Sequence, residues 1–571
     1  MPQISLPFSE ANKADRHDED FFQCSLYRML PKSAQVASQR CPHLLEYLHM
    51  VPIDEVGIPQ YYTRLSRKLQ EINHPHVIYP VTDNVFAHIY PDYHDGRDIY
   101  ISVEPVLFQN LEPLMLELEK RLLDMADSLS AMNTDEEKKK AFFSCIERSF
   151  TTRPEPRGLL RLLGRRDRRI RVTPRQLEGL RYLVVRDKIG LGILEPLVHD
   201  PYVEDISCSG VGTIFIEHKV FRSLKTTISF SSYEELDEFV LRLSERIKKP
   251  VTFRNPIVDA TLPDGSRINI VYGRDVSKRG SNFSIRKFSE VPMSVMELID
   301  LGTMDYRMAA YLSIVIAEGM NVFVAGETAS GKTTTLNALT TFIHPNAKIV
   351  SIEDTPELQV PHKNWIREVV QTTKAESETG VTMFDLLKAA LRQRPNQILV
   401  GEIRGPEGNI AFQAMQTGHS VMATFHAASV EKLIQRLTGS PINVPKTYVD
   451  NLNVVIIQSA VKLPSGRIGR RVLSINEIVG FDPQTQSFSF VEVFRWNPVN
   501  DTFEFTGDMN SYLLEQKIAV RLGIPSHKKR RIYLELQRRA EILERLHKEQ
   551  GVTGFYELLQ VLAKAQREGL F

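Results

Sequence analysis

A glycine-rich segment that ends in lysine and threonine is the strongest chemical signal in the sequence. The residues from Gly326 to Thr333 read GETASGKT, and they stand between the strand-like run NVFVA and the helix-prone run TTTLNALTTFI. In such a loop the glycines let the backbone curl, so that several N–H groups point at phosphate oxygens. Lys332 supplies a positive charge for the β- and γ-phosphates, and Thr333 offers a hydroxyl to Mg²⁺. This P-loop predicts nucleotide binding. The residues expected to contact the nucleotide are Gly326, Glu327, Thr328, Ala329, Ser330, Gly331, Lys332, Thr333 and Thr334.

Two later segments place carboxylates where apolar strands are expected to end. Glu353, Asp354 and Glu357 follow the run AKIVSI, and Glu402 follows the run NQILV and a glycine. Open α/β sheets place ligand chemistry at the carboxyl ends of their strands. A carboxylate there can activate a water molecule, and an acid at the end of a buried strand can hold Mg²⁺, usually through water. Each segment alone also fits a polar loop, but its position after the P-loop favours catalysis.

A fourth segment, GHSVMATFHAAS, places His419 before and His426 after another strand-like run. A histidine at the end of such a strand can sense the γ-phosphate or donate to it. A lone histidine is more often only a satisfied polar group, so this role depends on the other three segments.

The ordered set GETASGKT, SIEDTPEL, ILVGEIRGPE and GHSVMATFHAAS resembles the Walker A, Asp, Walker B and His boxes of the type II/type IV secretion ATPase superfamily. Members of this superfamily power type II secretion, type IV pilus assembly and retraction, archaellum rotation and type IV secretion. All four boxes occur in order at close to the family's spacing, and the resemblance covers about residues 176–480. It implies a PAS-like domain, a linker and a RecA-like ATPase domain, assembled as a homo-hexameric ring that uses ATP and Mg²⁺.

The resemblance also implies roles for single residues. Glu357 matches the family's catalytic glutamate, Glu402 the Walker B acid that shares Mg²⁺ with Thr333, and His426 the histidine of the His box. In the preceding domain, TLPDGSRINIVYG resembles the family's D-G-x-R stretch, which makes Arg267 a candidate arginine finger. FSIRKF resembles the strand before the linker, which makes Arg286 a second basic contact to the nucleotide.

Departures from the family pattern narrow the interpretation. Bacterial pilus-assembly and type II secretion members usually carry a four-cysteine metal domain after the Walker B box, whereas this chain has four scattered cysteines and no C-x-x-C pair. No zinc is therefore expected. The segments DPYVEDISCSG and SIRKF are more similar to those of the archaeal branch of the superfamily. The implied partners are a polytopic membrane platform protein and, indirectly, pilin-like substrates.

The elements around these motifs predict an α/β fold with several folded parts. Apolar strand-like runs alternate with helical stretches after Asn321, which is typical of a largely parallel sheet. The segment with nine arginines between Arg153 and Arg175 is expected to be a solvated linker, with contact to an acidic partner, lipid or nucleic acid as the alternative. The expected division is an N-terminal α+β domain of unknown role (1–150), the arginine-rich linker (151–175), the PAS-like α+β domain with the arginine finger (176–290), an interdomain linker (291–305), the RecA-like ATPase domain (306–508) and a helical tail (509–571).

Composition limits the competing functions. The 571 residues include 71 Lys+Arg and 70 Asp+Glu, a formal net charge of +1, which argues against bulk electrostatic binding of nucleic acid. A RecA-like nucleic-acid motor, a conjugation-type secretion ATPase and a nucleotide-binding scaffold without hydrolysis stay open as alternatives. The longest apolar stretch, Met308–Ala317, is shorter than the ~18–20 residues that span a bilayer. We expect a cytoplasmic protein held at a membrane by its partners.

Overall fold

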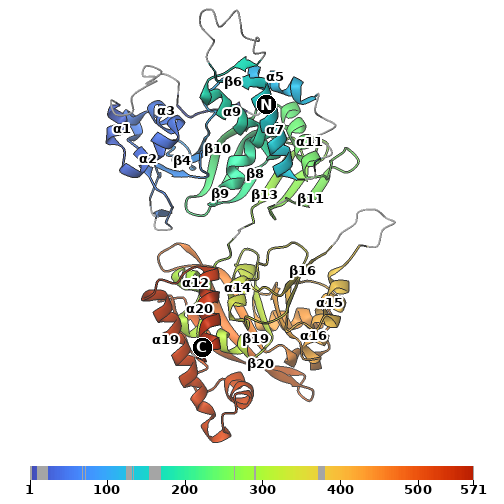
Figure 1. The fold of residues 1–571 in the computed structure, drawn as a ribbon. Helices are drawn as coiled ribbons and strands as arrows, with labels where there is room; N and C mark the ends of the chain where they lie inside the picture. Colours follow the sequence, from blue (N-terminus) through green and yellow to red (C-terminus); the bar gives the residue numbers. More distant parts are fainter. Residues whose placement is uncertain are drawn as a thin grey trace, which may run out of the picture. The chain divides into compact units, whose positions relative to one another are not determined.

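The computed structural model describes residues 3–8, 24–66, 69–70, 72–123, 132, 134–153, 169–262, 264–288, 291–370, 380–569 and 571. The chain forms two compact units, Met1–Phe288 (unit 1) and Ser289–Phe571 (unit 2). Each unit has its own large sheet with helices packed against it (Figure 1). The mixed α/β class expected from the sequence is confirmed. Most of the arginine-rich linker, residues 154–168, lies outside the described residues.

Unit 1 holds, within its described ranges, a sheet of eleven strands. In spatial order these are β11 (Ile257–Thr261), β12 (Arg267–Val271), β13 (Asn282–Arg286), β8 (Val203–Cys208), β9 (Gly212–His218), β10 (Arg222–Phe230), β5 (Ile99–Val103), β4 (Phe86–Tyr90), β3 (Val77–Pro80) and β2 (Gln60–Tyr61), with β1 (Gln3–Ile4) beside β10. Most neighbours are antiparallel, but β10 and β5 run parallel, with Thr226 opposite Tyr100. This pair joins the strands that precede residue 150 to the strands that follow residue 176.

A buried carboxylate ties the two halves of unit 1 together. Asp200 is fully buried, and its Oδ2 accepts hydrogen bonds from the hydroxyls of Tyr79 at 2.7 Å and Tyr100 at 2.8 Å. The Tyr79 hydroxyl also lies 3.0 Å from Nε2 of His218. Burial raises the pKa of the Asp200 carboxyl, which the two hydroxyls oppose. Because unpaired buried polar groups are costly, this cluster favours one mutual arrangement of the two halves.

Helices pack on both faces of this sheet. Near the N-terminus these are α1 (Ser25–Met29), α2 (Lys32–Arg40), α3 (Pro42–Met50) and α4 (Ile53–Val56); later ones are α5 (Glu112–Leu123), α7 (Asp135–Ser149), α9 (Pro174–Val184), α10 (Glu195–His199) and α11 (Tyr233–Arg246). Successive side chains of a strand point to opposite faces of the sheet, and this decides what each residue of β5 packs against. Ile99 and Ile101 face α1–α3, whereas Tyr100 faces the core shared with β8–β10. The short pair β6 (Phe150–Thr151) and β7 (Ile170–Arg171) flanks residues 154–168.

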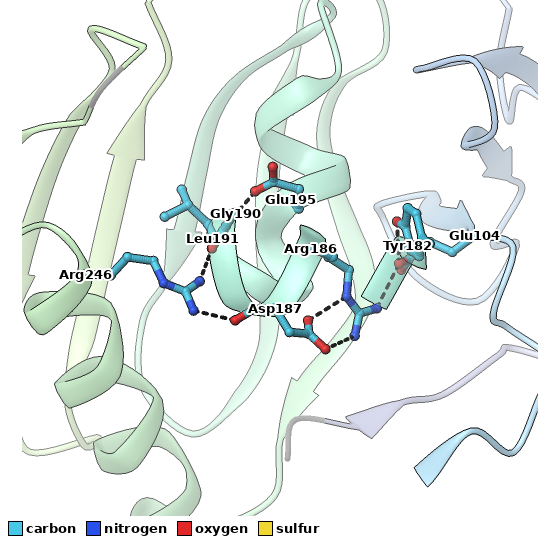
Figure 2. A network of polar contacts seen from close by, with 8 residues as sticks. All are labelled: Glu104, Tyr182, Arg186, Asp187, Gly190, Leu191, Glu195 and Arg246. Atoms are coloured by element: carbon cyan, nitrogen blue, oxygen red, sulfur yellow. Dashed lines mark hydrogen bonds and ion pairs between the residues drawn. The ribbon is translucent and has the colours of Figure 1, made fainter. Parts of the chain in front are cut away.

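Helix α9 continues as a π-helical turn, Val185–Ile189, which is held by a polar network (Figure 2). Arg186 donates to the buried carboxylate of Glu104 at 2.8 Å and to Asp187 at 2.7 Å, and the Tyr182 hydroxyl donates to Glu104 at 2.7 Å. On the other side of the turn Arg246 donates to the backbone carbonyl of Asp187 at 2.6 Å. The network therefore fixes α9 to the segment after β5.

Unit 2 contains, among its described residues, a sheet of nine strands. In spatial order these are β16 (Trp365–Val369), β15 (Ile349–Glu353), β17 (Gln397–Ile403), β18 (Ser420–Phe425), β14 (Val322–Gly326), β19 (Val454–Lys462), β20 (Ile468–Asp482), β21 (Ser487–Asn497) and β22 (Thr502–Glu504). The strands from β16 to β19 run parallel, and β19 to β22 are antiparallel. The largely parallel sheet expected from the sequence is present, and β21 and β22 form a hairpin at its edge.

Two apolar cores cover the two faces of this sheet. One core contains Val322 and Val324 of β14 and packs against α12 (Val295–Asp300), α13 (Tyr306–Ala317), α14 (Lys332–Leu339), α19 (Ile532–Lys548) and α20 (Phe555–Arg567). The other contains Phe323 and Ala325 and packs against α15 (Met383–Arg392), α16 (Glu407–Gln416) and α17 (Val430–Thr438). Because β14 is buried on both faces, it reads as a continuous apolar run in the sequence.

The last 63 residues belong to the same core as the nucleotide-binding motifs. Glu477 of β20 is fully buried and accepts hydrogen bonds from the hydroxyls of Tyr311 at 2.7 Å and Ser511 at 2.6 Å. Its other oxygen accepts the backbone N–H of Leu513, where a π-helical segment (Leu513–Ile518) begins ahead of the short α18 (Ala519–Arg521). The boundaries at 150, 175 and 508 thus fall inside compact units, and the division into six segments stays a prediction. No helix in the described parts of the chain is long and apolar enough to cross a bilayer.

Candidate active site

The P-loop has the local geometry that its sequence predicts. Strand β14 ends at Gly326 and α14 begins at Lys332, with Gly331 as the residue before the helix at a φ of +93°. The N-cap residue Gly331 has no side chain that could cap α14, so the first backbone N–H groups of the helix receive no hydrogen bond from it. A Cβ atom at Gly326 would lie 2.2 Å from the carbonyl oxygen of Gln458, and one at Gly331 would lie 3.0 Å from Nε2 of Gln458. Both glycines are therefore required by close approach to β19.

Lys332 has three charged neighbours that affect its pKa, namely Glu402, Arg404 and Glu357. Its ammonium donates to the carbonyl of Glu327 at 2.8 Å, within the loop itself. Burial lowers the pKa of Lys332, an effect that the nearby carboxylates of Glu402 and Glu357 oppose. Glu402 of β17 and Glu357 of the loop after β15 thus both act on the P-loop lysine.

Glu402 lies near the end of β17, where the pairing with β18 shifts in register between Val400 and Ile403. Its Oε2 accepts a hydrogen bond from Arg404 at 2.6 Å. Its Oε1 is buried and has no hydrogen-bond partner among the residues that the structure describes. A buried carboxylate oxygen with spare acceptor capacity, beside the hydroxyl-bearing start of α14, fits an oxygen ligand set for Mg²⁺ through water. These residues fit the predicted cofactor.

Glu353 and Glu357, two of the three acids of the Asp box, occupy different environments. Glu353, the last residue of β15, is 1% exposed, and burial raises its pKa to about 7. Glu357 is exposed, and the loop that carries it is fastened to the P-loop helix, because Asn337 donates to the Glu357 carbonyl at 3.2 Å. Glu357 and Asp354 are both exposed, whereas Glu353 is buried, and the catalytic role that the resemblance implies for Glu357 stays a prediction.

His426 follows β18 and lies against the P-loop, with its Nε2 2.9 Å from the hydroxyl of Thr328. Burial and the positive charge of Lys332 lower the pKa of His426, so the neutral imidazole is favoured. His419 precedes β18 and contacts Thr417 at the opposite end of that strand. The structure thus brings His426 into the cluster and leaves His419 out.

The two candidate arginines lie in unit 1, next to each other. Arg267 begins β12 and Arg286 ends β13, and the two residues are directly opposite in the register of these strands. Both side chains are exposed, and each has a carboxylate partner: Arg267 donates twice to Asp259, at 3.0 and 2.5 Å, and Arg286 lies 3.5 Å from Asp205. The P-loop belongs to unit 2, so their contact with a nucleotide stays a prediction.

Sequence reasoning missed three residues that position the P-loop. Gln458 of β19 accepts a hydrogen bond from the Thr335 hydroxyl at 2.7 Å, and Asn337 holds the Asp-box loop. Arg470 of β20 donates from its Nε to the carbonyl of Ala329 at 3.0 Å. Arg470 lies far from the P-loop in the sequence and outside all four boxes, so no local pattern could have indicated it.

The fold and the boxes define the class to which the chain belongs. The family model described as "Type II/IV secretion system protein" matches residues 187–474, and the chain is a member of this family. Its resemblance to secretion ATPases is thereby confirmed.

A relative in the archaeon Methanocaldococcus jannaschii, MJ0900, is 44% identical over 538 residues, which are 94% of this chain and 97% of that protein. This relative agrees with the predicted archaeal branch. The type IV secretion system protein PtlH of Bordetella pertussis is 34% identical over 32% of this chain and 60% of its own length. Among solved structures, the VirB11 ATPase of Brucella suis shares 23% identity with a TM-score of 0.26, covering 51% of this chain and 94% of its own. The ATPase DotB of Legionella pneumophila shares 21% identity with a TM-score of 0.37, covering 50% and 79%.

Proposed function

We propose that this protein is a cytoplasmic ATPase that works as a homo-hexameric ring and drives a membrane machine related to type II secretion systems, type IV pili or the archaellum. The observation that carries the proposal is the convergence of Lys332, Glu357 and Glu402 beside an uncapped helix N-terminus. Membership of the type II/IV secretion family supports the same reading. Unit 2 is the RecA-like ATPase domain of this proposal, and residues 176–290 include its PAS-like domain with the arginine finger.

The reaction is hydrolysis of ATP to ADP and phosphate. The backbone N–H groups of the P-loop and the Lys332 ammonium bind the phosphates. Glu357 accepts the proton of the attacking water, and His426, held by Thr328, lies beside the loop to sense the terminal phosphate. Thr333 and, through water, Glu402 would hold Mg²⁺, which would supply positive charge against the phosphates when bound. Arg267, with Arg286 beside it, stabilises the charge that spreads over the γ-phosphate oxygens.

The machine recruits the ring through a polytopic membrane platform protein, and pilin-like substrates are moved indirectly. The protein is peripheral to the membrane in this proposal. The proposal includes no zinc site, because the four cysteines are scattered and form no C-x-x-C pair.

Nucleotide binding and turnover test the proposal directly. The wild-type chain should bind ATP and release phosphate, and Lys332→Ala should bind ATP at least tenfold more weakly. Lys564→Ala, which alters an exposed lysine of α20, is the matched control and should behave as wild type. Binding without any hydrolysis, in the presence of lipid and of the platform protein, would favour a nucleotide-dependent scaffold. Strong stimulation by DNA would favour a nucleic-acid motor.

A further inference from the structure

Arg470 approaches the P-loop from the side opposite to the catalytic acids. Strand β14, which leads into the loop, has β18 and then β17 on one side, and these strands carry His426 and Glu402. On its other side lie β19 and then β20, and Arg470 is the third residue of β20. The P-loop is therefore flanked by acids and a histidine on one side and by a guanidinium on the other.

The position of Arg470 is set by its hairpin. In the register of β19 and β20, Gln458 pairs with Val472 and Ala460 pairs with Arg470, so these four residues share one face of the hairpin. Val472 is buried in the core under α14, and Gln458 is bonded to Thr335 of that helix. Arg470 lies on the same face as Val472, two residues nearer the tip of the hairpin. The face that packs into the core therefore also carries the Arg470 guanidinium, which lies beside the P-loop.

The contact with the loop is close. Nε of Arg470 lies 3.0 Å from the Ala329 carbonyl oxygen, and a Cβ atom on Gly331 would lie 3.2 Å from Cδ of Arg470. Nε is occupied by this bond, whereas Nη1 and Nη2 make no hydrogen bond or ion pair within the described part of the chain. An arginine side chain carries five N–H donors in a fixed fork, and phosphate oxygens match that fork. Four N–H donors at the edge of a phosphate-binding loop are thus available to a ligand.

We propose that Arg470 anchors the diphosphate part of the nucleotide, which ATP and ADP share, through its terminal guanidinium nitrogens. The inference rests on the proposed ATPase function. Glu357, Glu402 and His426 lie together on the other side of the loop and mark the end where the terminal phosphate is cleaved. The remaining phosphates then extend toward β20, where Arg470 meets them before and after hydrolysis.

An anchor of this kind stabilises the ground state and the transition state equally, so its loss raises KM and leaves kcat unchanged. Arg470→Ala should weaken binding of ADP and of a non-hydrolysable ATP analogue by the same factor, roughly tenfold or more for a charge-assisted hydrogen bond. At saturating ATP the variant should turn over within about twofold of wild type. Arg470→Lys keeps the charge without the fork and should lie between the two.

Arg471 provides a matched control one residue along the strand. Its buried guanidinium binds Asp501 at 2.7 and 2.8 Å and the Leu301 carbonyl at 2.9 Å, and so it supports the fold of unit 2 rather than the loop. Arg471→Ala should lower the unfolding temperature without nucleotide and leave the dissociation constants of the folded protein unchanged. Arg470→Ala should leave the unfolding temperature without nucleotide unchanged and raise the dissociation constants.

Isothermal titration with ADP and with the analogue, and steady-state kinetics, separate the outcomes. Wild-type ADP affinity in Arg470→Ala would overturn the inference while leaving the proposed function intact. A loss confined to the ATP analogue would also overturn it, since the residue would then act on the terminal phosphate. If the wild-type chain binds neither nucleotide, the proposed function fails and the inference fails with it.

Discussion

The carboxylate of Glu353 accepts hydrogen bonds from the backbone N–H groups of Glu357 and Leu358, with its Oε1 2.8 and 2.7 Å from the two nitrogens. The buried Glu353 therefore holds the turn that presents the exposed Glu357. Gly401 of the neighbouring strand leaves the room this requires, because a Cβ atom there would lie 3.2 Å from Cγ of Glu353. Glu353 acts as a positioning residue, and Glu357 is left as the candidate base.

Glu357→Gln should bind ATP as tightly as wild type and hydrolyse it far more slowly. The amide cannot accept the proton of water, and removal of a general base typically costs ~10²–10⁴-fold in rate. Single-turnover phosphate release with excess enzyme measures the chemical step, and titration with an ATP analogue supplies the binding control. A wild-type rate in this variant would remove Glu357 from the chemistry.

Glu353 should make the stability of unit 2 depend on pH. Its pKa in the folded protein is about 7, above the ordinary value of 4.5, because burial disfavours the charged carboxylate. The folded state therefore holds a proton that the unfolded state releases, and the free energy of unfolding falls as the pH rises from about 4.5 to about 7. Glu353→Gln should lack this part of the pH dependence.

The measurement follows denaturant unfolding at pH 5 and pH 8 by tryptophan fluorescence. Both tryptophans of the chain, Trp365 and Trp496, lie in unit 2, and Trp365 is on the strand beside β15. Wild type should lose more stability than Glu353→Gln between the two pH values. Parallel losses would show that Glu353 titrates normally.

Arg267→Ala should retain ATP binding and lose most hydrolysis, because a guanidinium that stabilises the γ-phosphate acts in the transition state. If it acts on a neighbouring subunit, mixing Arg267→Ala with Lys332→Ala should partly restore activity. The Lys332 variant still provides Arg267, and the Arg267 variant still provides an intact P-loop. Arg242→Ala, which alters an exposed arginine of α11, is the control. Verified mixed rings as inactive as both parents would contradict this role.

Tyr79→Phe should loosen unit 1 around the buried Asp200 and leave nucleotide affinity unchanged. Removing one of its two hydroxyl donors leaves part of a buried carboxylate unpaired, which typically costs ~1–3 kcal/mol. Hydrogen exchange should then be faster at amides of β3, β5 and β8, with α14 of unit 2 as the internal control. Equal protection in both proteins would mean that the cluster adds little to stability.

The same cluster changes how partner docking must be tested. Docking of the machine on the N-terminal segment, or on the arginine-rich segment from Arg153 to Arg175, stays a prediction. Deleting residues 1–149 removes Tyr79 and Tyr100 and would expose Asp200, so lost recruitment could reflect an unfolded unit 1. Substitutions of exposed residues on α1 and α2, such as Met29 and Val36, leave the strands intact. Recruitment that falls in such variants, with unchanged ATPase activity, would locate the dock on these helices.

The sequence predicted the loop before α14 and the strand ends beside Glu402 and His426 because strand ends and loop spacing are local properties, whereas the roles of Glu357, Glu402 and His426 follow from the resemblance and stay predictions. The alternation of apolar runs and helical stretches likewise gave the parallel sheet of unit 2. Arg470 could not be predicted, since only the pairing of β19 with β20 carries it to Ala329. The sequence did not indicate that residues 1–150 and 176–288 belong to one compact unit, for a similar reason. This unit depends on one parallel pairing, β5 with β10, and on Asp200, neither of which leaves a pattern within a short window of sequence.

The parallel pairing of β5 with β10 has a mechanical consequence. Strand β10 hydrogen-bonds to β9 on one side and to β5 on the other, so β2–β5 are continuous with the strands that carry Arg267 and Arg286. Pulling on β5 loads backbone hydrogen bonds along a sheet, and such a load is shared by neighbouring strands rather than absorbed by a loose tether. If nucleotide turnover moves the two arginines, we expect strands β2–β5 to move with them. A cargo or membrane anchor attached to these strands would then be displaced together with the two arginines in each cycle of nucleotide hydrolysis.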